Sequence, residues 1–224
     1  MFPIEKIEQE FDRFMALLEC TRVSDEVGSS PNFNNADYVN QLNKVVIELK
    51  VLNKDFFPNG GIIDSLSSII IKPVNIAQTG CGQYVFELPE INREGKNDNF
   101  EEPLRRILKK ANKQLKDTKK YYWGDNISYG FLIFAQVGIT ISPEITALLI
   151  QKLINKEFSS IDGVIICTPY HDLINPTTLK KNPNCLSVVR QDDENKINLC
   201  SYILNSWEEY YNSGGHNLTT ETKA

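Results

Sequence analysis

Hydrophobic and polar residues alternate along this chain with two periods, one typical of helices and one typical of strands. Residues 3–19 are expected to form a helix, because apolar side chains recur at helical spacing and Pro3 suits a first turn. Residues 101–121 carry a second apolar stripe of this kind, formed by Leu104, Ile107, Leu108, Ala111 and Leu115. Ser142 and Pro143 begin a third helix that ends near Lys156, and residues 201–212 have a helical pattern as well.

Several other segments have the continuous apolar composition of buried strands. Residues 130–137 and residues 162–167 flank the third helix, and such a strand–helix–strand order predicts parallel pairing. Residues 84–88 are expected to form a further strand. Residues 186–189 and 197–200 are expected to form a final hairpin. The fold class predicted by this order is α/β, with a mixed central sheet flanked by helices.

The segments between these elements are rich in turn-forming residues. Residues 24–36 are expected to form a loop, as are residues 58–61 and 89–99. Residues 62–74 could hold a strand, or a short helix followed by a strand. The glycine-rich residues 79–82 lack the Lys-Ser/Thr of a phosphate-binding loop and are interpreted as a turn. The chain is expected to form one domain over residues 1–212, with residues 213–224 as a disordered tail.

Composition narrows the class of protein further. The chain has 224 residues, 41% hydrophobic and 24% charged, which is ordinary for a soluble globular domain. Five scattered cysteines without a Cys-x-x-Cys pair favour reduced thiols and a cytoplasmic location over disulfides or a zinc site. The apolar runs are too short to span a membrane, the N-terminus does not resemble a signal peptide, and only two histidines are available for catalysis.

A hairpin over residues 35–50 carries the most informative charges. With a tight turn at Leu42 and Asn43, the register places Asp37 directly opposite Glu48. Strand alternation adds Lys50 to the same face, while the intervening apolar side chains point the other way. Two carboxylates so close together repel, and a hard divalent cation such as Mg²⁺ would relieve that repulsion. The hairpin therefore predicts a metal-dependent phosphodiesterase site.

Alternating charges also occur on surface strands that merely keep a protein soluble. The segment Val45-Val46-Ile47 that precedes Glu48 has a buried-strand composition, which favours the catalytic interpretation. Asp37 followed by Glu48-x-Lys50 resembles the Asp…(Asp/Glu)-x-Lys signature of the restriction-endonuclease-like nuclease superfamily. Ala36 stands where that signature commonly has proline, a departure that lowers the specificity of the match.

The resemblance implies a restriction-endonuclease-like core, with a helix, a three-stranded meander, a second helix and a further strand. It implies that Asp37 and Glu48 bind the metal, with the Leu49 carbonyl as a further ligand and Lys50 as the catalytic lysine. Relatives often supply a third acidic residue from the first helix or the segment after it. Glu10, Glu19 and Glu26 are available, and Glu26 is slightly preferred, although each is as well explained as a solvated acid.

The helix over residues 101–121 is strongly basic in an otherwise acidic protein of net charge −5. Between residues 105 and 120 it carries eight positive residues and the single acid Asp117. Such a concentration of charge suits a phosphate backbone, although a solvated helix face explains it nearly as well. The resemblance places this helix beside the active site. The candidate nucleic-acid-binding residues are Arg106, Lys109, Lys110, Lys113, Gln114 and Lys116.

Together these observations predict a Mg²⁺- or Mn²⁺-dependent nuclease, with DNA favoured over RNA as substrate and no membrane partner. A homodimer would suit double-strand cleavage, although no sequence feature indicates one. The alternative is a nuclease-fold module that has lost its chemistry and binds nucleic acid or another protein. The aromatic residues 121–123 could stack on bases, but packing under the helix end is the favoured interpretation.

Overall fold

The computed structural model describes residues 4–28, 31–52, 77–78, 84–85, 98–136, 143–167, 185–190 and 193–213. Its main sheet has six strands in the order β1-β2-β3-β6-β7-β8. The strands are β1 (Thr21–Arg22), β2 (Tyr38–Asn40), β3 (Val45–Leu52), β6 (Tyr129–Gln136), β7 (Gly163–Cys167) and β8 (Cys185–Val189). The helices are α1 (Ile4–Leu17), α2 (Val23–Val27), α4 (Asp98–Trp123), α5 (Pro143–Glu157) and α6 (Glu194–Asn212).

The sheet is mixed, as the sequence pattern predicted. Strands β1, β2 and β3 pair in antiparallel fashion as a meander, whereas β3, β6 and β7 are parallel neighbours. Strand β8 then pairs antiparallel with β7 at the opposite edge. Every residue of β7 and most residues of β3 and β6 are buried, which explains their continuous apolar composition. The prediction of an α/β protein with a mixed sheet and flanking helices is confirmed.

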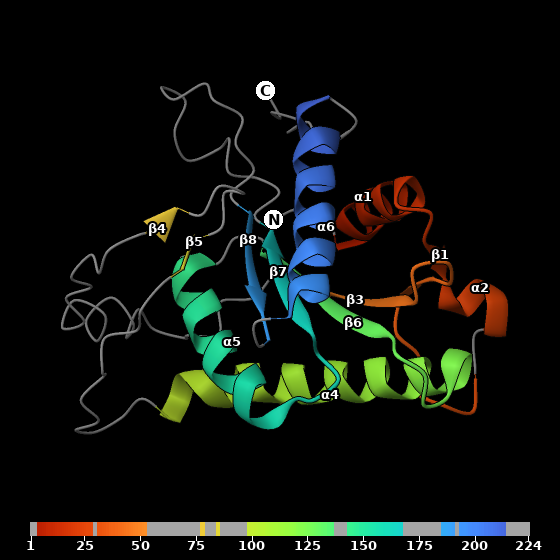
Figure 1. Ribbon diagram of the computed structural model, residues 1–224, viewed down its shortest axis with the longest axis horizontal. Helices are drawn as coiled ribbons and strands as arrows, with labels where there is room; N and C mark the ends of the chain where they lie inside the picture. The colour runs from red at the N-terminus through yellow and green to blue at the C-terminus, as the bar shows by residue number, and fades with distance from the viewer. Residues whose placement is uncertain are drawn as a thin grey trace.

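Helices cover both faces of this sheet (Figure 1). On one face, α1 and α6 pack through Phe11, Phe14 and Trp207 against the odd-numbered side chains of β3. On the other face, α4 and α5 pack against even-numbered side chains such as Val46 and Leu52. The two-residue period of a strand therefore decides which helices each side chain of β3 meets. Glu48 and Lys50 belong to the face covered by α4.

The hairpin register expected from the sequence is also confirmed. Tyr38 pairs with Ile47 and Asn40 with Val45, and residues 41–44 form the turn. The Asn40 side chain stabilises this turn by accepting a hydrogen bond of 2.8 Å from the backbone N–H of Asn43. Continued by one residue beyond Tyr38, the same register sets Asp37 opposite Glu48.

Three local predictions were wrong. Residues 197–200 belong to α6, because Asp193 caps the helix at its N-terminus and accepts from the N–H groups of Asn195 and Lys196. Apolar residues from Ile197 onward then recur at helical spacing through to Trp207. The segment 24–36 is not wholly a loop, since α2 ends within it, and α4 begins at Asp98 inside the expected loop 89–99.

Other predictions fall wholly or partly outside the described residues. These are the loop at 58–61, the apolar segment 62–74, the turn at 79–82, most of the segments 84–88 and 89–99, and the tail beyond residue 213. Residues 84–85 do form a strand, β5 (Tyr84–Val85), which pairs with β4 (Ala77–Gln78). No helix in the described part of the chain is long and apolar enough to cross a membrane.

Candidate active site

Asp37, Glu48 and Lys50 meet on the face of the sheet that α4 covers. The backbone N–H of Leu49 donates a hydrogen bond of 2.8 Å to Asp37 Oδ2, so the aspartate is held against β3. The Lys50 ammonium contacts Glu48 Oε1 directly. The hairpin thus assembles two carboxyl groups and one ammonium group, the combination that the sequence predicted.

Helix α4 completes this cluster through Gln114. Its Oε1 accepts a hydrogen bond of 3.3 Å from Lys50 Nζ, and its Nε2 donates one of 2.9 Å to the Asn35 carbonyl. One side chain therefore ties the lysine to the segment that carries Asp37. Gln114 is a predicted nucleic-acid contact on the helix expected beside the active site, and its contacts in the structure hold Lys50 and the segment before Asp37 in position.

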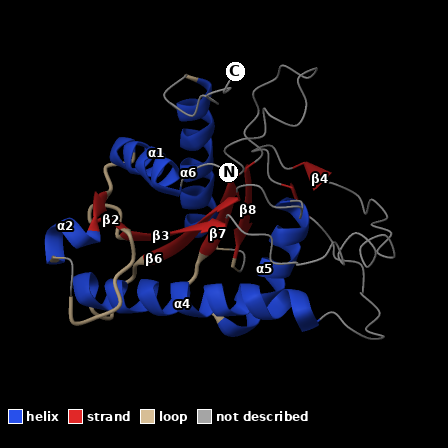
Figure 2. Ribbon diagram, turned by 180° about the vertical axis from the view of Figure 1, so that it is seen from behind, coloured by secondary structure: helices blue, strands red, loops and turns tan. Residues whose placement is uncertain are grey.

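The segment leading to Asp37 lies along α4 (Figure 2). Thr118 Oγ1 accepts a 2.8 Å hydrogen bond from the buried N–H of Ala36, and Asn34 Nδ2 donates one of 2.7 Å to Asp117 Oδ2. Sequence analysis did not identify Thr118 as a positioning residue. The sequence does contain a clue to Thr118: its hydroxyl side chain continues the apolar stripe of α4, the side of the helix that packs against the sheet. A buried hydroxyl needs a partner, and the Ala36 amide is that partner.

Burial controls the electrostatics of the carboxyl pair. The Glu48 side chain is 0% exposed, and burial together with the neighbouring Asp37 raises its pKa to about 8, against the opposing effects of Lys50 and Lys110. Burial also raises the pKa of Asp37, although the Leu49 N–H, Lys50, Arg22 and Glu48 act to lower it. Lys50 alone therefore does not compensate for the buried negative charge at this site.

The Oε2 atom of Glu48 indicates what could compensate for the remaining buried negative charge. Glu48 Oε2 is buried and has no hydrogen-bond partner. An orphaned carboxylate oxygen beside a second carboxylate suits a divalent cation, because Mg²⁺ is commonly held by one or two carboxylates together with waters and substrate phosphates. The residues present therefore fit such an ion. Residues of a strand direct N–H and C=O to the same edge, so the Leu49 carbonyl faces the Asp37 side as well.

Among the residues that the structure describes, no third acidic side chain joins the pair. Glu26 accepts hydrogen bonds from Thr21, Gln41 and Tyr122 on the surface. Glu10 is buried on α1, where Arg13 and Tyr210 bind it, and Glu19 is exposed. Among the described residues, no group of three or more His, Cys, Asp and Glu side chains could hold a metal. In the described part of the chain, Asp37 and Glu48 are thus the dyad of acids brought together at this site.

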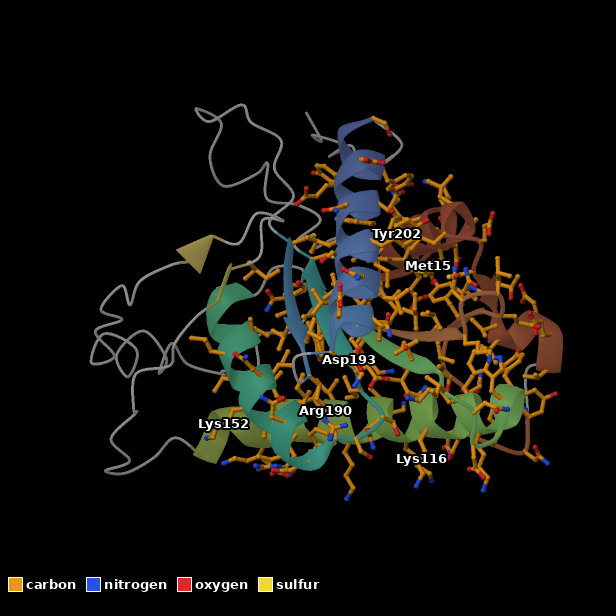
Figure 3. All side chains as sticks on the ribbon, in the orientation of Figure 1. Met15, Lys116, Lys152, Arg190, Asp193 and Tyr202 are labelled. Carbon is orange, nitrogen blue, oxygen red and sulfur yellow. The ribbon has the colours of Figure 1, made fainter. Side chains whose placement is uncertain are left out.

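The exposed lysines of α4 lie at two positions around the helix axis. Lys110 lies one turn before Gln114 and is close enough to Glu48 to lower its pKa. The other exposed lysines form a stripe about a third of a turn away from Gln114, made up of Lys109, Lys113, Lys116 and Lys120. Figure 3 shows Lys116 on the side of α4 that points away from the sheet. Arg106, the remaining candidate, is paired with Glu102.

A polar hollow of about 540 Å³ lies elsewhere, near the end of α4 and the starts of β6 and α6. Its lining includes Lys119, Lys196 and Asp162 but none of the three hairpin residues. Asp162 already binds both lysines, at 3.2 and 3.4 Å, and accepts from the Gly130 N–H. Because these charges satisfy one another, the hollow is a weaker candidate for chemistry than the cluster at Glu48.

Comparisons of this chain with protein-family models, with curated proteins and with solved structures found no match. The resemblance to the nuclease superfamily is therefore carried by Asp37, Glu48 and Lys50 themselves. What the structure adds is their surroundings: a carboxyl pair, a lysine fixed by Gln114, and an unsatisfied oxygen at the buried end of the site.

Proposed function

We propose that this protein is a Mg²⁺- or Mn²⁺-dependent nuclease that hydrolyses phosphodiester bonds, with DNA as the favoured substrate. The observation that carries the proposal is the buried, unpartnered Glu48 Oε2 beside Asp37 and Lys50. Burying a carboxylate oxygen without a partner costs free energy, and a bound cation would offset that cost. A cation and a phosphate together would complete the set of interactions.

The order of elements supports the same conclusion. A first helix, an antiparallel meander, a second helix and a strand parallel to the last strand of the meander are the core that the superfamily resemblance implies. In this chain the four parts are α1, β1-β2-β3, α4 and β6. We infer a restriction-endonuclease-like core from this order together with the motif, in which Asp37 immediately precedes β2 and Glu48-x-Lys50 lies on β3.

Each side chain has a role that its contacts suggest. Asp37 and Glu48 would hold the metal, which when bound polarises a phosphate oxygen and lowers the pKa of water. Lys50 is partly exposed, at 22% of its side chain, and so can reach a substrate while Gln114 limits its movement. Its ammonium would stabilise negative charge on the scissile phosphate or orient the attacking water. Lys110 would add positive charge beside the same phosphate.

The test is cleavage of single-stranded and double-stranded DNA in Mg²⁺, Mn²⁺ or EDTA. We expect metal-dependent cleavage by the wild type and a loss of about a hundredfold or more in Lys50→Ala, the size seen when one charge-stabilising group is removed. Lys6→Ala is the matched control, because Lys6 is an exposed lysine on α1, which covers the opposite face of the sheet. Equal activity in the two variants would refute the assignment of Lys50.

The competing function is a nuclease-fold module that binds nucleic acid without cutting it. It would be favoured if DNA bound to the wild type and remained intact with every metal. An RNA substrate would be tested before accepting that outcome, because nothing at the dyad distinguishes the two sugars. Glu48→Gln separates cleavage from binding. The variant should no longer cleave nucleic acid but should bind it through the lysines of α4 nearly as well as the wild type.

A further inference from the structure

Where the end of α4 meets the segment before Asp37, the exposed ring of Tyr121 stacks on the half-buried ring of Phe33. The rings of Phe33 and Tyr121 are stacked, with centroids 4.6 Å apart and an angle of 16° between their planes. Tyr121 is nevertheless 56% exposed, which is unusual for a large ring in a helix that otherwise buries its apolar side chains. The next two residues, Tyr122 and Trp123, are half-buried and pack against the core on this face of the sheet.

The pair is built on the same segment that positions Asp37. Phe33 precedes Asn34, which is bonded to Asp117, and the Asn35 carbonyl is bonded to Gln114. Tyr121 follows Gln114 on α4 by seven residues, a rise of about 10 Å. About three stacked nucleotides of one strand cover that length. A strand whose phosphate lies at Lys50 would therefore reach the aromatic pair with one of its nearby bases.

The chemistry around the pair suits a nucleotide. Lys113 and Lys120 are exposed on the same helix and make no ion pair with any residue that the structure describes. Flat aromatic faces combined with neighbouring ammonium groups are how proteins bind unpaired bases and their phosphates. Because the Phe33 ring already holds Tyr121 in one orientation, little side-chain freedom remains to be lost when a base stacks.

We propose that Phe33 and Tyr121 form a stacking platform for an unpaired base about three nucleotides from the scissile phosphate, so that the preferred substrate is single-stranded at this position. The inference rests on the proposed nuclease function and adds its substrate class. A base inside an intact duplex is covered on both faces by its neighbours, and the ring of Tyr121 would have nothing to contact. The platform consequently selects for a single strand or a single-stranded extension.

The experiment measures binding separately from cleavage. The full chain is titrated, in EDTA at low salt, against a fluorescently labelled 12-nucleotide single strand and against the corresponding blunt duplex. We expect Tyr121→Ala to weaken single-strand binding roughly tenfold, within the range for loss of one base–aromatic stack, and to change duplex binding little. Tyr121→Phe keeps the ring and should bind like the wild type.

The matched control is Tyr202→Ala, because Tyr202 is 55% exposed on α6, away from α4 (Figure 3). Equal binding by Tyr121→Ala and Tyr202→Ala would overturn the inference, as would equal weakening of single strand and duplex or no single-strand binding by the wild type. Tyr121-dependent binding without cleavage in any metal would instead refute the nuclease and leave the platform standing. If Tyr121→Ala cleaves single strands as fast as the wild type, the platform is refuted and the nuclease proposal stands.

Discussion

Replacing Glu48 by glutamine should make the metal-free protein more stable at alkaline pH. The Glu48 side chain is fully buried, its Oε2 lacks a partner, and its pKa is raised from 4.5 to about 8 by burial and by Asp37. Between pH 4.5 and about 8, the folded state therefore holds a proton on Glu48 that the unfolded state has already released. Stability contributed by that proton is fully present below pH 4.5 and is lost as the pH rises through about 8.

The size of the effect follows from the same two values. Each tenfold change in proton affinity is worth about 1.4 kcal/mol, so the span from 4.5 to about 8 bounds the effect near 5 kcal/mol. Ionised Glu48 retains its contact with Lys50, and we therefore expect a difference of a few kcal/mol. Glutamine does not ionise, and its amide can donate to Asp37 while its oxygen keeps the lysine contact.

Urea unfolding of the wild type and Glu48→Gln from pH 5 to pH 9 in EDTA checks this expectation. The unfolding free energies should be similar at pH 5 and should diverge as the pH rises, with the variant more stable at pH 9. Saturating Mg²⁺ at pH 8 should then stabilise the wild type by about 2–3 kcal/mol, as binding at a hundredfold excess over Kd would, and the variant much less. Parallel pH profiles would refute the buried-acid argument, and equal Mg²⁺ responses would refute the metal dyad.

Four further substitutions test how the site and the surrounding fold are supported. Thr118→Val leaves the buried Ala36 N–H without its acceptor, and thermal unfolding should reveal a loss of about 1–3 kcal/mol together with reduced cleavage. Gly130→Ala places a Cβ 2.3 Å from the Ser160 carbonyl oxygen, so urea unfolding should show that the protein loses several kcal/mol of stability. Gly124→Ala is the comparison: its Cβ meets nothing within 4 Å, but the φ of +61° strains alanine, and the loss of stability should be about 1–2 kcal/mol. Asp193→Ala removes the N-terminal cap of α6, and urea unfolding should show a loss of about 1 kcal/mol of stability with an unchanged response to Mg²⁺. Reduced cleavage by the folded variant would contradict a purely structural role for Asp193.

Much of the fold was predictable because its signals are local. The two-residue period of a strand and the tight turn at residues 41–44 determine the register of the hairpin, and that register sets Asp37 opposite Glu48. The apolar stripe of α4 and the continuous apolar composition of β6 and β7 likewise predicted their structures from neighbouring residues alone. The error at residues 197–200 arose where a short apolar segment fits a strand or a helix, and the Asp193 cap decided between them.

The amino-acid sequence by itself determined which residues gather at the candidate site, since the hairpin register sets Asp37 opposite Glu48 and strand alternation adds Lys50 to the same face. Only the tertiary structure decided what surrounds them. Gln114 meets the carbonyl of Asn35, a residue 79 positions earlier in the chain, and nothing in the local pattern of either segment encodes that contact. The orphaned oxygen of Glu48, the separation of Lys110 from the outer lysine stripe, and the stack of Phe33 on Tyr121 all depend on how α4 packs against the sheet. Packing between distant segments sets burial, and burial sets the pKa values and the unsatisfied groups on which the proposed function rests.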